Sequence, residues 1–167
     1  GRVRVTPTLI RAGDATQLWA NVYDESIAEI FQLQSDISKK LVDALGIALA
    51  GPEERLLEAR PTENMEAYDY YLRGLDYYRS RVMEDSRLAI EMFEKAVSLD
   101  PVFIQAYEKL SREQCLHYWL HFCRSYERVA KAKEAAEMAY KINPESPEAH
   151  TSLGFYYYPV SYTHLKL

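Results

Sequence analysis

The sequence predicts a mainly α-helical protein with a small β-hairpin and one helix at its amino-terminal end. Three observations lead to this fold class. From residue 64 to residue 158, apolar side chains recur every three or four positions, which is the period of a helix. Within that region, segments 89–101 and 132–144 share one layout of small residues and a closing proline. Residues 3–23 instead alternate between apolar and polar side chains, which is the period of a strand.

Length, composition and net charge limit the kinds of protein that this chain can be. A chain of 167 residues holds one domain or one domain plus part of another, and a hydrophobic content of 48% is enough for a packed core. The formal charge of −5 argues against a nucleic-acid-binding surface, which is usually basic. No apolar run reaches the roughly 20 residues of a membrane helix, so we expect no membrane segment and a cytoplasmic location. The chain lacks an initiating Met, and we interpret residue 1 as a truncation.

The two cysteines are expected to be free thiols. Cys115 and Cys123 are eight positions apart in one predicted helix. Their Cα atoms would then lie about 12 Å apart, whereas a disulfide needs less than about 7 Å.

The first 50 residues are predicted to form a partial α/β domain. Strands are expected over residues 3–11 and 17–23, and Pro7 should place the first at a sheet edge or in a bulge. A helix is expected over residues 27–49, capped by Asp24 or Ser26 and ended by Gly51 and Pro52. Residues 51–63 are then a linker, with a short helix that begins at Pro52 and a boundary at Arg60–Pro61–Thr62.

Residues 64–158 are predicted to form helical hairpins. One helix is expected from Met65 to Ser80, followed by a break at residues 83–85 and a second helix over residues 86–99. A long helix is expected to begin near Ala106, with its partner over residues 130–142, and a third hairpin to begin near His150. Pro159 should break that helix, and we interpret residues 159–167 as an atypical tail of foreign, adaptor-derived sequence.

The two proline-closed segments match at three offsets. When Pro101 is aligned with Pro144, small residues or one aromatic fall at the same positions upstream, where neighbouring helices would touch. The matched pairs are Ala89 with Ala132, Phe93 with Ala136, and Ala96 with Ala139.

This layout resembles the tetratricopeptide repeat (TPR). The family pattern places a large residue, a Leu-Gly pair and a Tyr in a first helix, then Ala, Phe, Ala and Pro in a second. The resemblance implies an α-solenoid of about two and a half hairpins. Two spacings depart from it, because Gly74 to Ala89 is 15 residues and Ser111 to Ala132 is 21. The residues that it assigns to packing between helices are Tyr70, Gly74, Tyr77, Ala89, Phe93, Ala96, Pro101, Tyr107, Ser111, Ala132, Ala139, Pro144 and Gly154.

The amino-terminal region resembles the end of a TolB-like amino-terminal domain. That domain precedes TPR repeats in bacterial adenylate-cyclase-like signalling proteins and in winged-helix regulators. The resemblance implies that most of its sheet lies upstream of residue 1. It rests on Val3, Val5, Leu9, Leu18, Trp19, Tyr23, Asp24, Ile30, Phe31, Gln34 and Ile37.

The search for chemical motifs gives no catalytic or cofactor site. Phosphate-binding loops, dinucleotide fingerprints and nucleophile elbows are not found. Glu113, His117 and His121 share one helix face at zinc-ligand spacing, but Tyr118 stands where a zinc protease needs Glu, and we interpret the set as packing. We therefore expect no metal, no cofactor and no enzymatic activity in this segment.

A tyrosine-rich surface is the candidate partner-binding groove. In TPR arrays such positions of the first helix line the concave face, and rigid rings suit binding surfaces. The alternative is that the rings pack against a neighbouring helix. Tyr71 and Leu75 stand where some family members carry a Lys/Asn clamp for a peptide carboxylate, so that mode is not expected. The candidate residues are Tyr68, Tyr71, Leu75, Tyr78 and Arg79.

The function that the sequence predicts is a non-catalytic protein-interaction scaffold of a bacterial signalling or regulatory protein. Its partner would be a protein or peptide, and the exposed end of the array could support a homodimer. The alternatives are the regulatory region of an adenylate-cyclase-like enzyme and that of a winged-helix transcription regulator.

Overall fold

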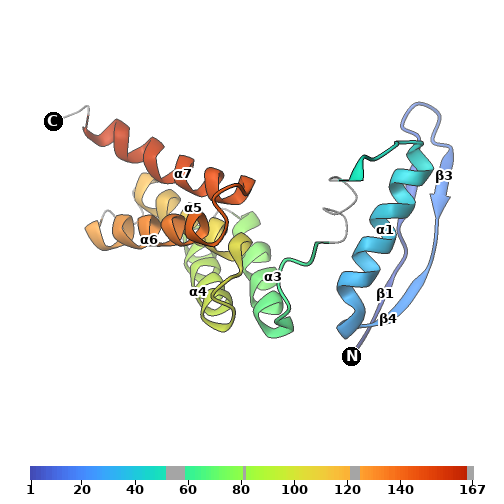
Figure 1. The fold of residues 1–167 in the computed structure, drawn as a ribbon, viewed down its shortest axis with the longest axis horizontal. Helices are drawn as coiled ribbons and strands as arrows, with labels where there is room; N and C mark the ends of the chain where they lie inside the picture. Colours follow the sequence, from blue (N-terminus) through green and yellow to red (C-terminus); the bar gives the residue numbers. More distant parts are fainter. Residues whose placement is uncertain (52–58, 81, 121–124, 165–167) are drawn as a thin grey trace. The chain divides into compact units, whose positions relative to one another are not determined.

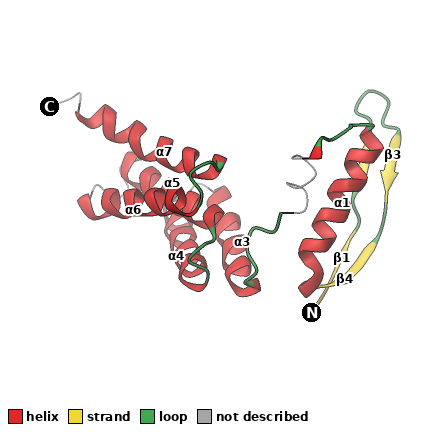
Figure 2. Ribbon diagram, in the orientation of Figure 1, coloured by secondary structure: helices red, strands yellow, loops and turns green. Residues whose placement is uncertain are grey.

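The structure is a computed structural model that describes residues 1–51, 59–80, 82–120 and 125–164. It is mainly helical with a small amino-terminal hairpin, as the sequence predicts. The chain divides into two compact units, Gly1–Arg60 and Pro61–Leu167, and each is described by itself. Among the described residues, strands occur only in the first unit (Figure 2).

The strands of the first unit form one long antiparallel hairpin with an interruption. Strand β1 (Arg2–Val5) pairs with β4 (Tyr23–Ser26), and β2 (Thr8–Ile10) pairs with β3 (Gln17–Ala20). Pro7 lies between the two ladders, where its carbonyl accepts a 3.3 Å hydrogen bond from the Asn21 amide. Proline has no N–H to donate to a ladder, and the irregularity in strand register lies further on, between Leu9 and Ile10.

Helix α1 (Ile30–Leu45) follows a short 3-10 turn, η1 (Ile27–Glu29), and lies along the hairpin (Figure 1). Its buried side chains include Phe31 and Leu33. The helix ends at Gly46 and not at the predicted Gly51. Gly46 adopts a left-handed conformation (φ 67°) that suits glycine, and its amide donates to Asp43.

The predicted cap of this helix is also corrected. Asp24 and Ser26 belong to β4, and Glu29 holds the N-cap position without a side-chain cap bond. The Asp24 carboxylate instead accepts hydrogen bonds from Arg2 (3.0 Å) and Arg4 (2.7 Å) on the paired strand. The Asp24 carboxylate therefore bonds to the paired strand and does not cap the helix. The predicted short helix from Pro52 lies outside the described residues.

The second unit is a series of packed helices (Figure 1). Each helix packs against the next along the chain, and the last also packs against α5. This places α3–α4 and α5–α6 as two helical hairpins, with α7 against the second. The helices are α3 (Met65–Ser80), α4 (Met83–Leu99), α5 (Ile104–Trp119), α6 (Tyr126–Ile142) and α7 (Pro147–His164).

Helices α3 and α4 approach closely at Gly74. A Cβ atom at Gly74 would lie closer to Cε1 of Phe93 than real Cβ atoms lie to their neighbours. The Phe93 side chain is completely buried, as are Ala89 and Ala96 on the same stripe of α4. The phenyl ring therefore occupies the space that the missing side chain leaves open.

Helices α5 and α6 meet through small residues. The Ser111 hydroxyl donates a 2.9 Å hydrogen bond to the carbonyl oxygen of Ala132 across the contact. Ala132, Ala136 and Ala139 are all completely buried. The equivalent positions of the two hairpins thus both lie in the core.

The turns that close the two hairpins have the same hydrogen bonds. Asp100 and Asn143 are extended residues just before a proline, where helical backbone is disfavoured. The Asp100 side chain accepts from the amide of Val102 at 3.0 Å, and the Asn143 side chain accepts from the amide of Glu145 at 3.1 Å. The prolines therefore end both helices at equivalent points.

Three predicted helix bounds in the second unit are wrong, namely the starts of α4 and α6 and the end of α7. Helix α4 begins at Met83 rather than Ser86, because Glu84 and Asp85 suit the positive end of a helix and Glu84 pairs with Arg87. Helix α6 begins at Tyr126 rather than Ala130.

The N-cap of α6 explains why this helix starts earlier than predicted, because the Ser125 hydroxyl accepts a hydrogen bond from the Arg128 amide at 3.3 Å. Helix α7 continues through Pro159 to His164. An interior proline removes one backbone bond and can kink a helix without ending it. The foreign origin of residues 159–167 stays a prediction, and residues 165–167 lie outside the described ranges.

Candidate functional site

Most of the predicted tyrosine groove packs against the core of the first hairpin. The Tyr68 side chain is only 7% exposed. The Tyr71 ring lies 4.9 Å from the Phe103 ring and 5.9 Å from the Phe93 ring, measured between centroids. Leu75 and Tyr78 also pack against this core, whereas Arg79, in the last turn of α3, is exposed.

Burial also changes the acidity of one member of this set, Tyr71. It raises the pKa of Tyr71 to about 12, with smaller contributions from the carboxylates of Glu108 and Glu148. The phenol therefore stays protonated at neutral pH. These rings have a packing role, and their role in binding stays a prediction.

Arg112 of α5 contacts aromatic rings on two other helices of the second unit, α3 and α7. Its guanidinium carbon lies 5.4 Å from the ring centroid of Tyr78 on α3 and 4.3 Å from that of Phe155 on α7. The Lys109 ammonium lies 5.8 Å from the Tyr78 ring. Cations over aromatic faces are attracted to the ring, so α3, α5 and α7 are joined by these contacts.

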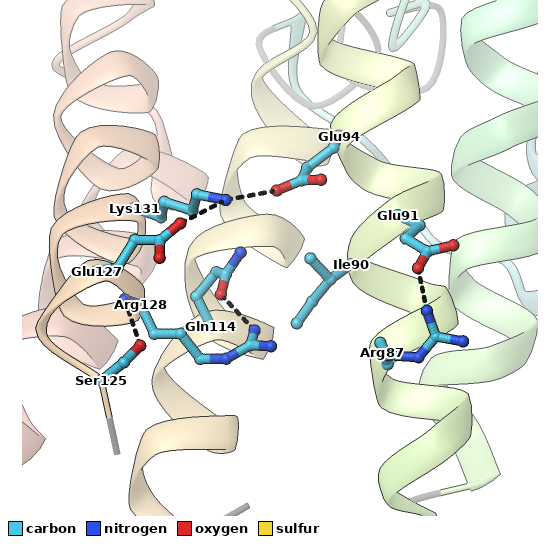
Figure 3. Close-up of a pocket in the computed structure, with 9 residues that line it drawn as sticks. All are labelled: Arg87, Ile90, Glu91, Glu94, Gln114, Ser125, Glu127, Arg128 and Lys131. Atoms are coloured by element: carbon cyan, nitrogen blue, oxygen red, sulfur yellow. Dashed lines mark hydrogen bonds and ion pairs between the residues drawn. The ribbon is translucent and has the colours of Figure 1, made fainter. Parts of the chain in front are cut away.

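A groove with a cavity at each end runs between α4 and α6, with α5 at its base. The two cavities measure about 310 and 320 Å³ and share three lining residues, Glu94, Gln114 and Lys131. We name them the Arg128 cavity and the Tyr107 cavity. The Arg128 cavity is also lined by Arg87, Ile90, Glu91, Ser125, Glu127 and Arg128 (Figure 3), and the Tyr107 cavity by Val97, Tyr107, Leu110, Glu134, Ala135 and Met138.

Charged side chains in the Arg128 cavity are paired with one another (Figure 3). The Lys131 ammonium lies 3.3 Å from Glu127 and 3.8 Å from Glu94, which joins α6 to α4. The Arg128 guanidinium donates a 2.9 Å hydrogen bond to the buried Gln114 side chain. Arg87 pairs with Glu91 on α4. These contacts leave this cavity nearly neutral.

The Tyr107 cavity has an apolar base and acidic sides. Leu110 and Ala135 are buried beneath it, and Val97 is half-buried at its edge. The carboxylates of Glu94 and Glu134 come from opposite helices. Burial raises the pKa of the Tyr107 phenol, with further contributions from Glu134 and Asp100. The arrangement suits an apolar side chain beside a cation.

The two described members of the predicted histidine set, Glu113 and His117, are part of the core. Glu113 is 3% exposed and accepts a hydrogen bond from the Ser86 hydroxyl of α4. His117 is also 3% exposed, and burial, with a smaller effect of Arg128, lowers its pKa. His121 lies outside the described residues. In the described part of the chain, no group of three or more His, Cys, Asp or Glu side chains could hold a metal ion.

Two further properties limit the possible functions, namely the acidity of the Cys115 thiol and the length and polarity of the helices. Burial raises the pKa of the Cys115 thiol to about 12, so this sulfur is protonated and unreactive at neutral pH. None of the helices in the described ranges is both long and apolar enough to cross a membrane.

Sequence reasoning missed the α4–α6 groove because the two helices are not neighbours in the chain. Each supplies residues at i, i+4 and i+7, the spacing of one helix face. A signal was therefore present in both segments, but only the position of α5 shows that the two faces share a groove. The residues are Ile90, Glu94 and Val97 on α4 and Lys131, Ala135 and Met138 on α6.

Comparisons with known proteins find a distant similarity to a bacterial protein. No family model matches the chain. A protein of Rhizobium meliloti (strain 1021) named "Putative adenylate cyclase 3" is 26% identical over 155 residues. The matched region covers 91% of this chain and 26% of the relative, so the chain spans about a quarter of that protein's length.

Proposed function

We propose that the second unit is a TPR-type array that acts as a non-catalytic protein-interaction scaffold in a bacterial signalling or regulatory protein. The observation that carries this proposal is the contact of Gly74 with Phe93. A glycine facing an aromatic ring of the next helix is the packing that the TPR pattern requires. In the second hairpin, Ser111 stands at the place of Gly74 and bonds to Ala132, the residue that matches Ala89.

Repetition in the turns supports the same array. Asp100 and Asn143 form equivalent side-chain bonds before equivalent prolines. Hairpins that repeat in this way stack on their neighbours and present long surfaces to partners. The homodimer that the sequence suggests would use the open side of α7, where nothing lies within 4 Å of a Cβ built on Gly154.

The surfaces of the second unit favour binding over catalysis. The groove between α4 and α6 has the size of a small binding cleft and combines apolar and charged side chains. Amphipathic helices bind to grooves of this kind through side chains at i, i+3, i+4 and i+7. We propose the groove, together with the side of the unit that carries Arg112, as the surfaces that contact a partner.

A second candidate follows from the similarity to the Rhizobium meliloti protein. The name of that protein favours a role for this region as the regulatory part of an adenylate-cyclase-like enzyme. The resemblance of residues 1–50 to the end of a TolB-like domain fits the same context. The two proposals can be distinguished by removing this region from the longer protein. Loss of a regulatory region changes catalysis elsewhere in the protein, whereas loss of a scaffold does not.

Selection of peptides on the purified chain tests the scaffold. We expect a displayed random-peptide library to yield related sequences that bind the folded chain and not the urea-unfolded chain. A library that yields no folded-state binder contradicts the proposal, as does formation of cyclic AMP from Mg-ATP by this chain alone.

The regulatory role needs a different experiment. The matched region would be deleted from the Rhizobium meliloti protein, and cyclic AMP output of the deleted and intact proteins compared at equal folded concentration. A changed output supports regulation, and an unchanged output removes this second candidate.

A further inference from the structure

We infer that the Tyr107 cavity binds a basic peptide segment, in which a bulky apolar side chain lies next to a lysine or an arginine. The inference rests on the proposed scaffold function and names the chemistry of its partner.

The base of the cavity selects an apolar side chain. Leu110 is 8% and Ala135 is 3% exposed, and both belong to the core shared by α4, α5 and α6. Val97 and Met138 are half-buried at the edge of the cavity. An incoming Leu, Met or Phe side chain would cover these groups, and its transfer from water favours binding. A cavity of about 320 Å³ is at the small end of ligand pockets, so it accepts one or two side chains.

The sides of the cavity select a positive charge. Glu134 on α6 makes no ion pair with any described residue, and it faces the cavity together with Glu94 of α4. Tyr107 lines the same cavity, and an aromatic ring can attract a cation. An acidic segment would instead bring its carboxylates next to two others above an apolar surface. Like charges at such a site are unfavourable.

Lys131 does not neutralise this end of the groove. Its ammonium lies 3.8 Å from Glu94 but 3.3 Å from Glu127, at the other end. Lys131 and Glu94 are 49% and 44% exposed, and an exposed pair of this kind contributes little. A cation from a partner can therefore replace Lys131 beside Glu94 while Lys131 stays paired with Glu127.

The Arg128 cavity provides an internal contrast. Its cations already have partners, in that Arg87 pairs with Glu91 and Arg128 with Gln114. It has nearly the same volume and is lined by the same helices, but it has no uncompensated carboxylate equivalent to Glu134. Selectivity for a basic segment is therefore assigned to the Tyr107 end of the groove.

The test uses the full chain and three synthetic peptides. All carry leucines at helical i, i+4 and i+7 positions, and their remaining positions are lysine, glutamine or glutamate. Fluorescence anisotropy of the labelled peptides gives the affinities at low and at high salt. We expect the lysine peptide to bind about tenfold more tightly than the glutamate peptide at low salt, and salt to reduce the difference.

Two charge-reversal variants locate the site. Glu134→Lys should weaken binding of the lysine peptide about tenfold and strengthen that of the glutamate peptide. Glu137→Lys makes the same change in net charge one turn away, at an exposed residue that pairs with Lys133 outside the cavity, and should leave both affinities within about twofold. Circular dichroism checks that both variants fold like the parent chain. Met138→Ala should weaken all three peptides, since it removes apolar contact area.

Each outcome decides between this inference and the scaffold function. Equal or tighter binding of the glutamate peptide overturns the inference, as do equal effects of Glu134→Lys and Glu137→Lys. A library-selected peptide whose binding is lost on Tyr78→Ala but kept in Glu134→Lys overturns the inference and leaves the scaffold in place. If sedimentation shows that Glu134→Lys breaks a dimer, the cavity is occupied by a second copy and the inference is also wrong.

Discussion

The two complete helical hairpins make the equivalent helix contact in different ways. In α3–α4, a glycine faces the buried ring of Phe93. In α5–α6, the position that matches Phe93 is Ala136, and the helices meet through small side chains and the hydrogen bond from Ser111 to Ala132. One hairpin thus depends on a single large side chain, and the other on several small contacts.

The difference extends to the rest of each core. The second hairpin buries five polar side chains of α5, namely Glu108, Ser111, Glu113, Gln114 and His117. Three of them have interhelical hydrogen bonds, since Ser111 donates to Ala132 of α6, Glu113 accepts from Ser86 of α4, and Gln114 accepts from Arg128 of α6. A buried polar network is stable only while its members stay paired. The comparison therefore teaches that the first hairpin should respond to changes in volume, and the second to changes in charge.

The largest effect is expected from removing the ring that fills the first hairpin. Phe93→Ala should lower the free energy of unfolding by about 3–5 kcal/mol, because it leaves a cavity where the ring met Gly74. Ala136→Gly, at the matching place in α6, should cost only about 1 kcal/mol from helix propensity. Urea unfolding followed by circular dichroism measures both. Similar losses for the two variants would show that the hairpins do not differ in this way.

The second prediction tests why glycine stands at two matching positions. Gly74→Ala should cost about 2 kcal/mol, because its Cβ would meet the Phe93 ring. Gly154→Ala, in α7, meets nothing within 4 Å and should stabilise the helix by about 1 kcal/mol. Thermal unfolding of both variants decides the point.

A rescue experiment identifies the cause. In the Gly74→Ala background, Phe93→Leu makes room for the new methyl group and should cost less than it does alone. Additive costs would mean that the two residues do not share the contact.

The third prediction concerns acid and the second hairpin. The pKa of His117 is lowered in the folded state, so the unfolded chain takes up a proton first as the pH falls. Its contribution to stability is complete above the ordinary histidine pKa of about 6.5 and is lost as the pH falls below that value. Hydrogen exchange should therefore show protection falling in α5 and α6 before α3 and α4.

A matched variant makes the third prediction specific. His117→Gln keeps a polar side chain but cannot take up a proton in this range, so its stability should depend less on pH between about 5 and 7. An unchanged pH dependence would assign the acid effect to other groups.

Local signals predicted much of the fold. The bounds of α3 follow from periodicity, and the ends of α4 and α6 follow from the prolines after Asp100 and Asn143. The starts of α4 and α6 were harder to predict, because the residues around Met83 and Tyr126 are compatible with either a loop turn or the first turn of a helix. Gly46 and Gly51 are equal stop signals by type, and only the backbone conformation at Gly46 distinguishes them.

The candidate site was less predictable than the fold. The tyrosines were correctly placed on one helix, but whether a ring packs or binds depends on neighbours such as Phe103, which come from another part of the chain. The groove between α4 and α6 depends on three helices at once. Periodicity shows which face a residue shares, and it does not show which helix lies opposite.

The smallest effect is expected at the hydrogen bond that replaces the ring in the second hairpin. Ser111→Ala removes the buried donor to the Ala132 carbonyl. Ser98→Ala is its control, because the exposed Ser98 hydroxyl donates to the Lys95 carbonyl within α4 and gains the same helix propensity. The difference between the two variants should be about 1 kcal/mol of unfolding free energy, the usual net value of a buried hydrogen bond. If denaturant titrations give equal values, the small residues alone hold α5 and α6 together, and the hydroxyl adds nothing beyond its size.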